Sequence, residues 1–387
     1  MAGDSPLEQR IRARVAALSA NGLLRTLREP AGIDLSSNDY LNLSKHPAVA
    51  TRLIEGIVRE GCGSTGSRLL RGERECFAAV ERRFARFKGA ERALYFSTGY
   101  LANIGVLTTL AETGDVIFSD KRNHASLIDG MRLSRARAAV FPHNDVLRLE
   151  RLLAGSSDSG VRFVVVESLF SMDGDVAPLA EYAALCRSSG AVLVVDEAHA
   201  VGIYGGRGSG LMEAAGIDDE PCISINTAGK ALGVAGAFVA GPSWAIEYLV
   251  QRARPFVFST APPPALADAL DASLTIVAEE PERRERLLVR AAYVRARLAA
   301  AGIDPGASRS QIIPIVIGEN DRAVAVARAI QAEGFDVRAI RPPSVPAGTA
   351  RLRVSVNAGL PEATLDRFVE VLAAALREAG RCSAASS

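Results

Sequence analysis

The chain has 387 residues, of which 48% are hydrophobic and 23% are charged, and a formal net charge of +1. Such a length suggests two or three domains with a substantial core, and the dispersed basic residues argue against nucleic acid or an anionic membrane as a partner. The five cysteines form no C-x-x-C pair, and the four histidines lack metal-ligand spacing. Without an apolar signal region, or a run of the roughly 18 apolar residues that a spanning helix needs, we expect a soluble cytoplasmic protein.

The first predicted element is a helix over residues 5–19, SPLEQRIRARVAALS. Ser5 and Glu8 have the spacing of a capping box, and Pro6 suits the first helical position. Apolar residues recur at helical spacing and form one stripe, made of Leu7, Ile11, Val15 and Leu18. The pattern predicts an amphipathic helix.

Strand and helix patterns alternate from about Asn38 onward. Helical periodicity covers residues 47–60, 73–87 and 100–110, and short apolar runs predict strands at ALYFS, DVIFS, AAVFP, RFVVVES, AVLVVDE, CISIN and GAFVAG. Phe163–Val166 and Val192–Val195 are apolar throughout, as strands buried on both faces are. The alternation predicts an α/β fold with a mostly parallel central sheet, helices on both faces and right-handed crossovers.

The composition changes at three consecutive prolines, Pro262–Pro264, which cannot lie inside a sheet. A long charged helix is predicted near 281–301, followed by the strand IIPIVIG, a helix over 321–333, the strands DVRAI and ARLRVSVN, and a last amphipathic helix. We therefore predict an N-terminal arm (1–37) that packs with a small C-terminal α/β domain (279–387), and a large cofactor-binding domain (38–278). The tail RCSAASS, residues 381–387, is predicted to be disordered.

Polar residues gather at the carboxyl ends of the predicted strands, where open parallel sheets bind ligands. The run VLVVDEAH delivers Asp196 to a strand end, with His199 three residues later. An aspartate that only caps a helix is one interpretation. Another is the Walker B segment of an ATPase, because DEAH also occurs there.

The ATPase interpretation requires an upstream G-x-x-x-x-G-K-[ST] loop to hold phosphates. The chain has one Gly-Lys pair, Gly229–Lys230. This pair lies downstream of the DEAH run, is followed by Ala231 and has Ser224 in place of the first glycine of the loop. We therefore reject the ATPase interpretation. The G-x-G-x-x-G pattern in GCGSTG follows a predicted helix instead of a strand, so a nicotinamide cofactor lacks its required context as well.

Pyridoxal phosphate fits these residues better. This cofactor needs a lysine for a Schiff base, a carboxylate for its ring nitrogen, an anion site for its phosphate and a flat group against its ring. Asp196 suits the carboxylate, and Lys230, which follows the strand CISIN among small uncharged neighbours, suits the lysine. The absence of a nearby counter-ion in the sequence would lower the pKa of this lysine. A surface lysine on a glycine-rich turn is the alternative.

Other strand ends offer the remaining groups. YFSTGYLANIGVL predicts a strand, a turn at Ser97–Gly99 and a helix whose first N–H groups would bind a phosphate, although an ordinary turn would look the same. His124 in NHASLIDG could stack on a flat ring or be structural. Ser168 and Ser171 end a further strand. The conjunction of these features on one sheet favours a cofactor site.

With these motifs in view, residues 35–376 resemble the α-oxoamine synthase family of fold-type I pyridoxal phosphate enzymes, which have the aspartate aminotransferase-like fold. The resemblance is carried, in order, by SSNDYLNLS, GSTGSRLLRG, STGYLANIGVL, NHASLIDGMRLSRA, HND, SLFSMDGDVAPL, VVDEAHAVG, TAGKALG, RARPFVFSTAPPPA and IRPPSVPAGTARLRVS. It implies a pyridoxal phosphate-dependent acyltransferase that works as a homodimer.

The resemblance also implies a role for individual residues. Lys230 would carry the cofactor and move protons, Asp196 would pair with the ring nitrogen, and His124 would stack on the ring. Further cofactor contacts would come from Gly99, Tyr100, Ser171, His199 and Thr227, and from Ser259 and Thr260 across the dimer interface. Substrate contacts would come from Arg353 and Asn38 at the amino acid carboxylate, with His124 nearby, and from Arg25 and Ser344 at the acyl group.

Within the family, AIRPPSVPAGTARLR is most similar to the branch that condenses L-alanine with a pimeloyl thioester, on CoA or a carrier protein, in biotin biosynthesis. Ser344 replaces the usual threonine, and VNAG at Val356–Gly359 replaces a TAAH-like ending, so the acyl preference stays open. Other branches, such as those using glycine with acetyl-CoA or longer acyl chains, are alternatives. A remote alternative is a cofactor-binding regulator without catalysis.

Overall fold

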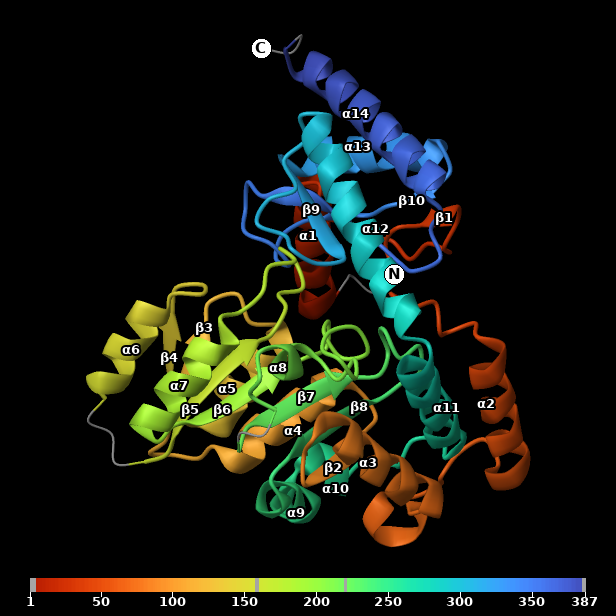
Figure 1. The fold of residues 1–387 in the computed structure, drawn as a ribbon. Coiled ribbons are helices and arrows are strands. Elements are labelled where there is room, and N and C mark those ends of the chain that lie inside the picture. The colour runs from red at the N-terminus through yellow and green to blue at the C-terminus, as the bar shows by residue number, and fades with distance from the viewer. Residues whose placement is uncertain (1–4, 157–159, 219–220, 385–387) are drawn as a thin grey trace.

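The computed structural model describes residues 5–156, 160–218 and 221–384. Figure 1 shows a broad α/β domain below and a smaller α/β domain above it. In chain order the large domain contains α2 (Pro47–Glu60), a π-helical turn (Arg68–Gly72), α3 (Glu75–Lys88), β2 (Arg92–Phe96), α4 (Gly99–Leu110), β3 (Val116–Asp120), α5 (Ala125–Ser134), β4 (Arg137–Phe141), α6 (Val146–Ala154), β5 (Arg162–Glu167), α7 (Leu179–Ser189), β6 (Val192–Asp196), α8 (Leu211–Ala214), β7 (Ile223–Thr227), β8 (Ala237–Gly241), α9 (Ser243–Arg252), α10 (Arg254–Val257) and α11 (Ala265–Glu279).

The seven strands form one sheet in the order β2-β8-β7-β6-β5-β3-β4. Only β8 runs against its neighbours, since it pairs antiparallel with both β2 and β7. The predicted fold class, a mostly parallel sheet with helices on both faces, is confirmed. Because β3, β5, β6 and β7 run the same way, their carboxyl ends lie at one edge of the sheet.

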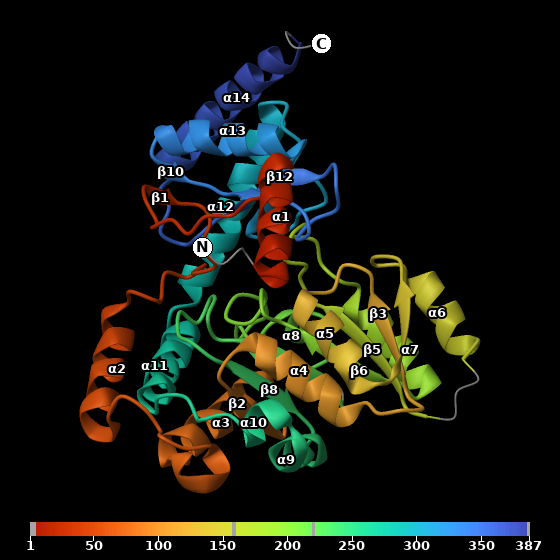
Figure 2. The ribbon, with the colours of Figure 1, turned by 180° about the vertical axis from the view of Figure 1, so that it is seen from behind.

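Both faces of the sheet are buried, as the continuous apolar strands predicted. Along β5, Val164 and Val166 belong to the larger core, whereas Phe163 and Val165 belong to a second core on the opposite face. Figure 1 shows α6, α7 and α8 in front of the sheet, and Figure 2 shows α4, α5 and α9 in front after half a turn. Alternate residues of a strand point to opposite faces, so an apolar run has two apolar layers to pack against.

The small domain contains α12 (Pro281–Ala300), β9 (Ile312–Gly318), α13 (Asn320–Ala332), β10 (Phe335–Asp336), β11 (Ala339–Ile340), β12 (Ala350–Ser355) and α14 (Glu362–Ala384). Strands β11, β12 and β9 form an antiparallel sheet. The N-terminal strand β1 (Ile33–Asp34) pairs in parallel with β10, which joins the N-terminal arm to this domain. The proposed boundaries at residues 37 and 278 stay a prediction.

The first helix agrees with its prediction, whereas the last helix is longer than predicted. Helix α1 (Pro6–Ala20) begins where expected, and the Ser5 hydroxyl accepts the Glu8 N–H at 3.2 Å. Its apolar stripe lies open to solvent in this single chain, with Leu7 57% exposed. The predicted disorder after Arg381 is wrong as far as Ala384, because α14 continues to that residue; residues 385–387 and 1–4 lie outside the described residues.

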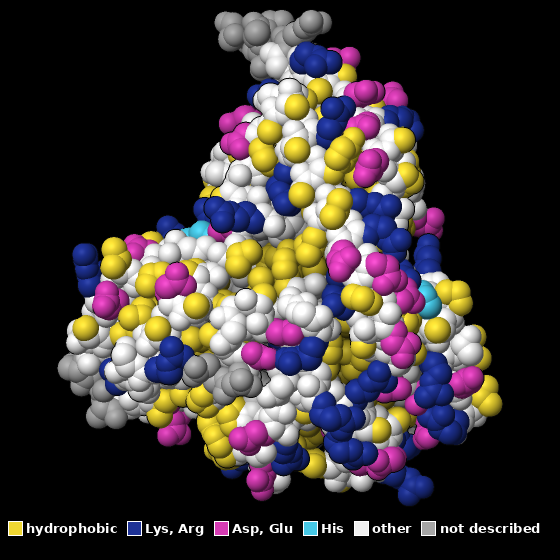
Figure 3. Space-filling view, viewed as in Figure 1, with side chains coloured by type: hydrophobic (Ala, Val, Ile, Leu, Met, Phe, Trp, Pro, Cys, Tyr) yellow, Lys and Arg dark blue, Asp and Glu magenta, His cyan; other side chains and the backbone are white. Residues whose placement is uncertain are grey.

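The surface agrees with the balanced composition. Lys and Arg side chains are interspersed with Asp and Glu side chains over the face in Figure 3, and apolar side chains gather between the two domains. Across the three described stretches of chain, no helix is long and apolar enough to cross a membrane.

A half-buried histidine, His143, ties the loop after β5 to the end of β3. His143 Nδ1 lies 3.0 Å from Asp120 Oδ1, and its Nε2 lies 2.5 Å from Asp175 Oδ2. Burial alone would lower the pKa of His143, but its hydrogen bonds and the charges of the two carboxylates raise this pKa to about 9. The ring is therefore an imidazolium at neutral pH, and it fixes the loop that carries Ser171.

Candidate active site

A cavity of about 180 Å³ lies at the carboxyl edge of the large sheet. Helix α4 contributes to its wall, as do the ends of β5, β6 and β7 and the turns that follow β3, β6 and β7. It brings together many of the predicted site residues, namely Gly99, Tyr100, His124, Asp196, His199, Thr227 and Lys230. Parallel strands deliver their last side chains to one place, which explains how residues 131 positions apart in the chain meet here.

Asp196 is held in one orientation by hydrogen bonds to both of its carboxylate oxygens. Its side chain ends β6, and the residue is 6% exposed. The Asn103 side-chain amide donates to Oδ2 at 2.7 Å, and the Ala198 N–H donates to Oδ1 at 2.9 Å. Asn103 also donates to Ser126 Oγ at 2.8 Å. Two donors on a carboxylate stabilise its ionised form and fix its orientation, as a partner for a protonated ring nitrogen requires.

A chain of hydrogen bonds leads from Lys230 out of the cavity. Lys230 Nζ lies 2.8 Å from His199 Nε2, and His199 Nδ1 lies 2.7 Å from Tyr40 Oη. Tyr40 donates to Asn38 Oδ1 at 2.9 Å, so its oxygen accepts from His199 Nδ1–H and leaves Nε2 as the acceptor toward Lys230. Burial, with Lys230 and Arg353 nearby, holds the pKa of His199 well below its ordinary value. His199 is therefore neutral.

The environment of Lys230 favours its amine form. Burial lowers the pKa of Lys230 to about 8, although Asp196 and Glu167 act in the opposite direction. The sequence predicted a lowered pKa from the missing counter-ion, and the structure adds burial as the main cause. An amine, unlike an ammonium, can attack a carbonyl and accept a proton.

An anion cradle forms where α4 begins beside the end of β7. The Thr98 hydroxyl caps α4 by accepting the Leu101 N–H at 3.2 Å. Gly99 leaves its Cβ position empty, and a Cβ there would lie 2.2 Å from Thr227 Oγ1. The N–H groups at the start of α4 and the Thr227 hydroxyl are the kind of donors that a phosphate binds.

His124 lines the same cavity and is held in place by its own helix. It is the N-cap of α5, and its Nδ1 accepts the Ser126 N–H at 3.3 Å and lies 2.7 Å from Ser126 Oγ. Its ring meets that of Tyr100 edge-on, with the centroids 6.4 Å apart. Tyr100 donates to Asp129. Burial lowers the pKa of His124, which leaves a flat neutral ring in the cavity wall.

Arg353 comes from β12 of the small domain and reaches the same network. Its Nη2 donates to Asn38 Oδ1 at 3.0 Å and to Tyr40 Oη at 3.2 Å. Its Nε donates to the Ser171 carbonyl at 2.5 Å, and its Nη1 donates to Ser355 Oγ at 2.7 Å. Arg353 and Asn38 therefore lie together, as expected, whereas Ser171 contributes its backbone here.

Comparison with known proteins identifies the family. The aminotransferase class I and II family model matches residues 30–372. The chain is 47% identical over 381 residues to an 8-amino-7-oxononanoate synthase from Anaeromyxobacter dehalogenans, covering 95% of both chains. The chain belongs to the α-oxoamine synthases.

Solved structures of this α-oxoamine synthase fold agree. A serine palmitoyltransferase solved with pyridoxal phosphate superposes with a TM-score of 0.90 at 30% identity, covering 97% of this chain and all of that one. An 8-amino-7-oxononanoate synthase from Francisella tularensis gives 0.79 at 28% identity, covering 90% of this chain and 98% of that one. The cofactor of this chain is pyridoxal phosphate. The residues present fit it, since Asp196, His124, Lys230 and the Gly99 cradle supply all four requirements.

Some residues that the resemblance assigned to this α-oxoamine synthase lie elsewhere. Ser259 and Thr260 line a separate crevice beside Arg68 and Tyr95. Arg25 lines a groove of about 410 Å³ with Pro342 and other apolar residues, and Ser344 stands on the turn just beyond. None of these residues lines the Lys230 cavity of the same chain.

Sequence reasoning missed four residues around the α-oxoamine synthase cavity, namely Tyr40, Asn103, Ser126 and Glu167. Asn103 sits one helical turn after Gly99, and its position on the inner face of the predicted helix is the signal that could have found it. Glu167 closes the strand RFVVVES just before Ser168, and its place at a strand end is the signal that points to it.

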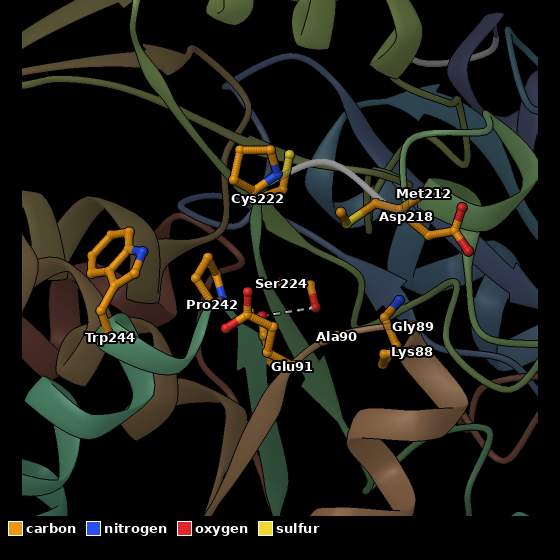
Figure 4. Close-up of a pocket in the computed structure, with 13 residues that line it drawn as sticks. Lys88, Gly89, Ala90, Glu91, Met212, Asp218, Cys222, Ser224, Pro242 and Trp244 are labelled. Atoms are coloured by element: carbon orange, nitrogen blue, oxygen red, sulfur yellow. Dashed lines mark hydrogen bonds between the residues drawn. The ribbon is translucent and has the colours of Figure 1, made fainter.

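A second cavity of about 220 Å³ opens at the amino edge of the sheet (Figure 4). It lies where β7 begins and β8 ends, beside Cys222 and Trp244, on the side opposite Lys230. Its lysine, Lys88, pairs with Glu197 and donates to the Ser209 carbonyl at 2.7 Å. That amine is already engaged, so the cavity does not compete with Lys230 as the cofactor site.

Proposed function

We propose that this enzyme condenses L-alanine with a pimeloyl thioester and forms 8-amino-7-oxononanoate, CO2 and a free thiol. The observation that carries the proposal is the cavity that unites Lys230, Asp196 and His124 in a chain 47% identical to a named 8-amino-7-oxononanoate synthase. Pyridoxal phosphate, when bound, withdraws electrons from the α-carbon of the amino acid and so makes a carbanion accessible.

Lys230 is the proposed attachment point and proton carrier. As an amine, its Nζ takes the α-proton of L-alanine and later returns a proton to the product. His199 accepts a hydrogen bond from Nζ at 2.8 Å, which aims the amine without adding charge. Asp196 keeps the ring nitrogen protonated, because a buried carboxylate with fixed donors stabilises a cation beside it.

Arg353 is the proposed partner of the amino acid carboxylate. A guanidinium presents a planar fork that matches a carboxylate with two parallel hydrogen bonds. Its contacts with Asn38 and the Ser171 carbonyl hold that fork beside the Lys230–His199–Tyr40 chain. Ser171, whose carbonyl tethers Arg353, is a proposed cofactor contact as well.

Arg25 and Ser344 are the proposed contacts of the acyl chain. The groove beside Arg25 is lined by Leu18, Leu23 and Leu24 together with two prolines. A pimeloyl group is a chain of methylenes that ends in a carboxylate. An apolar wall with one guanidinium suits both parts of such a chain.

We further propose that the enzyme is a cytoplasmic homodimer. Ser259 and Thr260 follow Phe258, a large apolar side chain that is 72% exposed, and they lie outside the cavity of their own chain. A groove of about 1040 Å³ beside them is lined by Phe258, Tyr248 and Leu133, all exposed. Exposed apolar patches of this kind mark protein interfaces, and a second copy would bring Ser259 and Thr260 to the partner's phosphate.

A substrate panel tests the proposed reaction. L-alanine, glycine and L-serine would each be offered with pimeloyl, acetyl and palmitoyl thioesters, and CO2 and thiol release would be measured. We expect L-alanine with the pimeloyl thioester to give the highest kcat/KM. Preference for glycine with acetyl-CoA, or for L-serine with palmitoyl-CoA, would assign the chain to another branch. Release with no pair would leave a cofactor-binding regulator.

A further inference from the structure

A second carboxylate lies next to Asp196, and the mechanism above does not use it. Glu167 ends β5, Asp196 ends β6, and the two residues are direct register partners. Register partners on parallel strands project from the same face of a sheet with their backbones about 4.8 Å apart. Both residues line the Lys230 cavity, and Glu167 is only 3% exposed.

The two carboxylates differ in their hydrogen bonds. Each oxygen of Asp196 accepts a hydrogen bond from a fixed donor. For Glu167, Oε2 accepts the Ser171 N–H at 3.3 Å, whereas the buried Oε1 accepts no hydrogen bond of good geometry from the described residues, the His124 N–H interacting only weakly with this carboxyl. An ionised oxygen left bare in a buried site is costly, but a protonated oxygen is not.

Adjacent buried carboxylates cannot both ionise cheaply, so one of them keeps a proton. Burial, with Asp196 adding to it, raises the pKa of Glu167 to about 8, while Lys230 and the backbone N–H groups of Ser171 and His124 act in the opposite direction. The charged or titratable groups around the pair come from several elements and comprise Asp196, Lys230, His124, His199 and Arg353. Both the hydrogen bonds and the nearby charges therefore favour a protonated Glu167 beside an ionised Asp196.

We propose that Glu167 is a positioning residue that holds a proton in the apoprotein and thereby favours the amine form of Lys230, the form that takes up the cofactor. A neutral Glu167 leaves Asp196 as the sole carboxylate beside Lys230. An ionised Glu167 would add a second negative charge and favour the ammonium. Glu167 thus controls when Lys230 can accept pyridoxal phosphate and move protons. This inference rests on the proposed role of Lys230 but not on the identity of the thioester.

The test follows the rate at which the apoprotein takes up pyridoxal phosphate, read from its visible absorbance between pH 6 and 10. In the wild type, Glu167 and Lys230 titrate together, so the rate should rise over a broad range in two steps. Glu167→Gln is permanently neutral at this site, so its rate should rise in one step with a midpoint about one unit lower. Infrared difference spectra at pH 7 should show a protonated carboxyl that this variant lacks.

Matched variants separate this role from a structural one. Ser168 is the next residue, is fully buried and has an unpaired hydroxyl, but it does not line the cavity, so Ser168→Ala should keep the wild-type profile. Lys230→Ala lacks the amine that joins the cofactor, so it should bind pyridoxal phosphate without the change in visible absorbance that the wild type shows. If Glu167→Gln has the wild-type profile, or no protonated carboxyl disappears, the proposal is overturned even though Lys230 keeps its role. If that variant does not fold, a one-step wild-type profile overturns it equally.

Discussion

Gly99→Ala should damage cofactor binding through one contact. The added Cβ would lie 2.2 Å from Thr227 Oγ1, although real Cβ atoms do not approach another atom within 3.0 Å. Thr227 must then move by about 0.8 Å or rotate its hydroxyl away. Either change removes its proposed hydrogen bond to the phosphate. A hydrogen bond to a charged group contributes about 1.5–3 kcal/mol, so pyridoxal phosphate should bind roughly 10- to 150-fold more weakly.

Fluorescence or absorbance titration of the apoprotein with pyridoxal phosphate measures this affinity directly. Gly206→Ala is the control, because its Cβ would meet only Glu213 Oε1, at an ordinary 3.5 Å. Comparing the melting temperatures of the apoproteins separates lost binding from lost folding. If a folded Gly99→Ala protein binds pyridoxal phosphate with unchanged affinity, the anion cradle at the start of α4 does not hold the phosphate.

Three further predictions concern substrate, pH and assembly. Arg353→Lys should raise KM for L-alanine by about tenfold or more, with a smaller change in kcat, because an ammonium cannot make a bidentate pair; an unchanged KM would remove Arg353 from the carboxylate site. His143 has a raised pKa, so it stabilises the fold fully below about pH 6.5 and this contribution, roughly 1–3 kcal/mol, is lost as pH rises through 9. Denaturant titrations should show that loss in the wild type beyond any seen in His143→Gln, and parallel curves would contradict it. Lys230→Ala mixed with a Ser259→Ala/Thr260→Ala double variant should recover about a quarter of wild-type activity if the dimer shares its sites, and no recovery would contradict sharing.

The sequence allowed the strands to be predicted because each is short, apolar and bounded by polar turns. Asp196 and Lys230 could be found for the same reason, since each follows a buried strand and stands out in charge. The strand order and the reversed direction of β8 could not be predicted, because they depend on which helix crosses to which face of the sheet. The hydrophobic period of a segment shows its type but not its neighbours in the sheet.

The hydrogen-bond partners of the site were harder to predict than its charges. Tyr40 lies 159 positions before His199, yet the two residues are directly bonded. Glu167 and Asp196 become neighbours only through the register of β5 and β6. The solvent-exposed apolar stripe of α1 shows a second kind of limit on prediction from sequence. Periodicity predicted that Leu7 and its neighbours form one face, but it could not say whether the same chain covers that face.

The central claim is that Lys230 drives a decarboxylative condensation of L-alanine. The most direct measurement incubates the cofactor-loaded enzyme with L-alanine and a pimeloyl thioester and counts CO2, free thiol and 8-amino-7-oxononanoate, with Lys230→Ala in parallel. We predict one of each product per turnover in the wild type and none above background in the variant. Thiol release without CO2, or full activity in Lys230→Ala, would contradict the account.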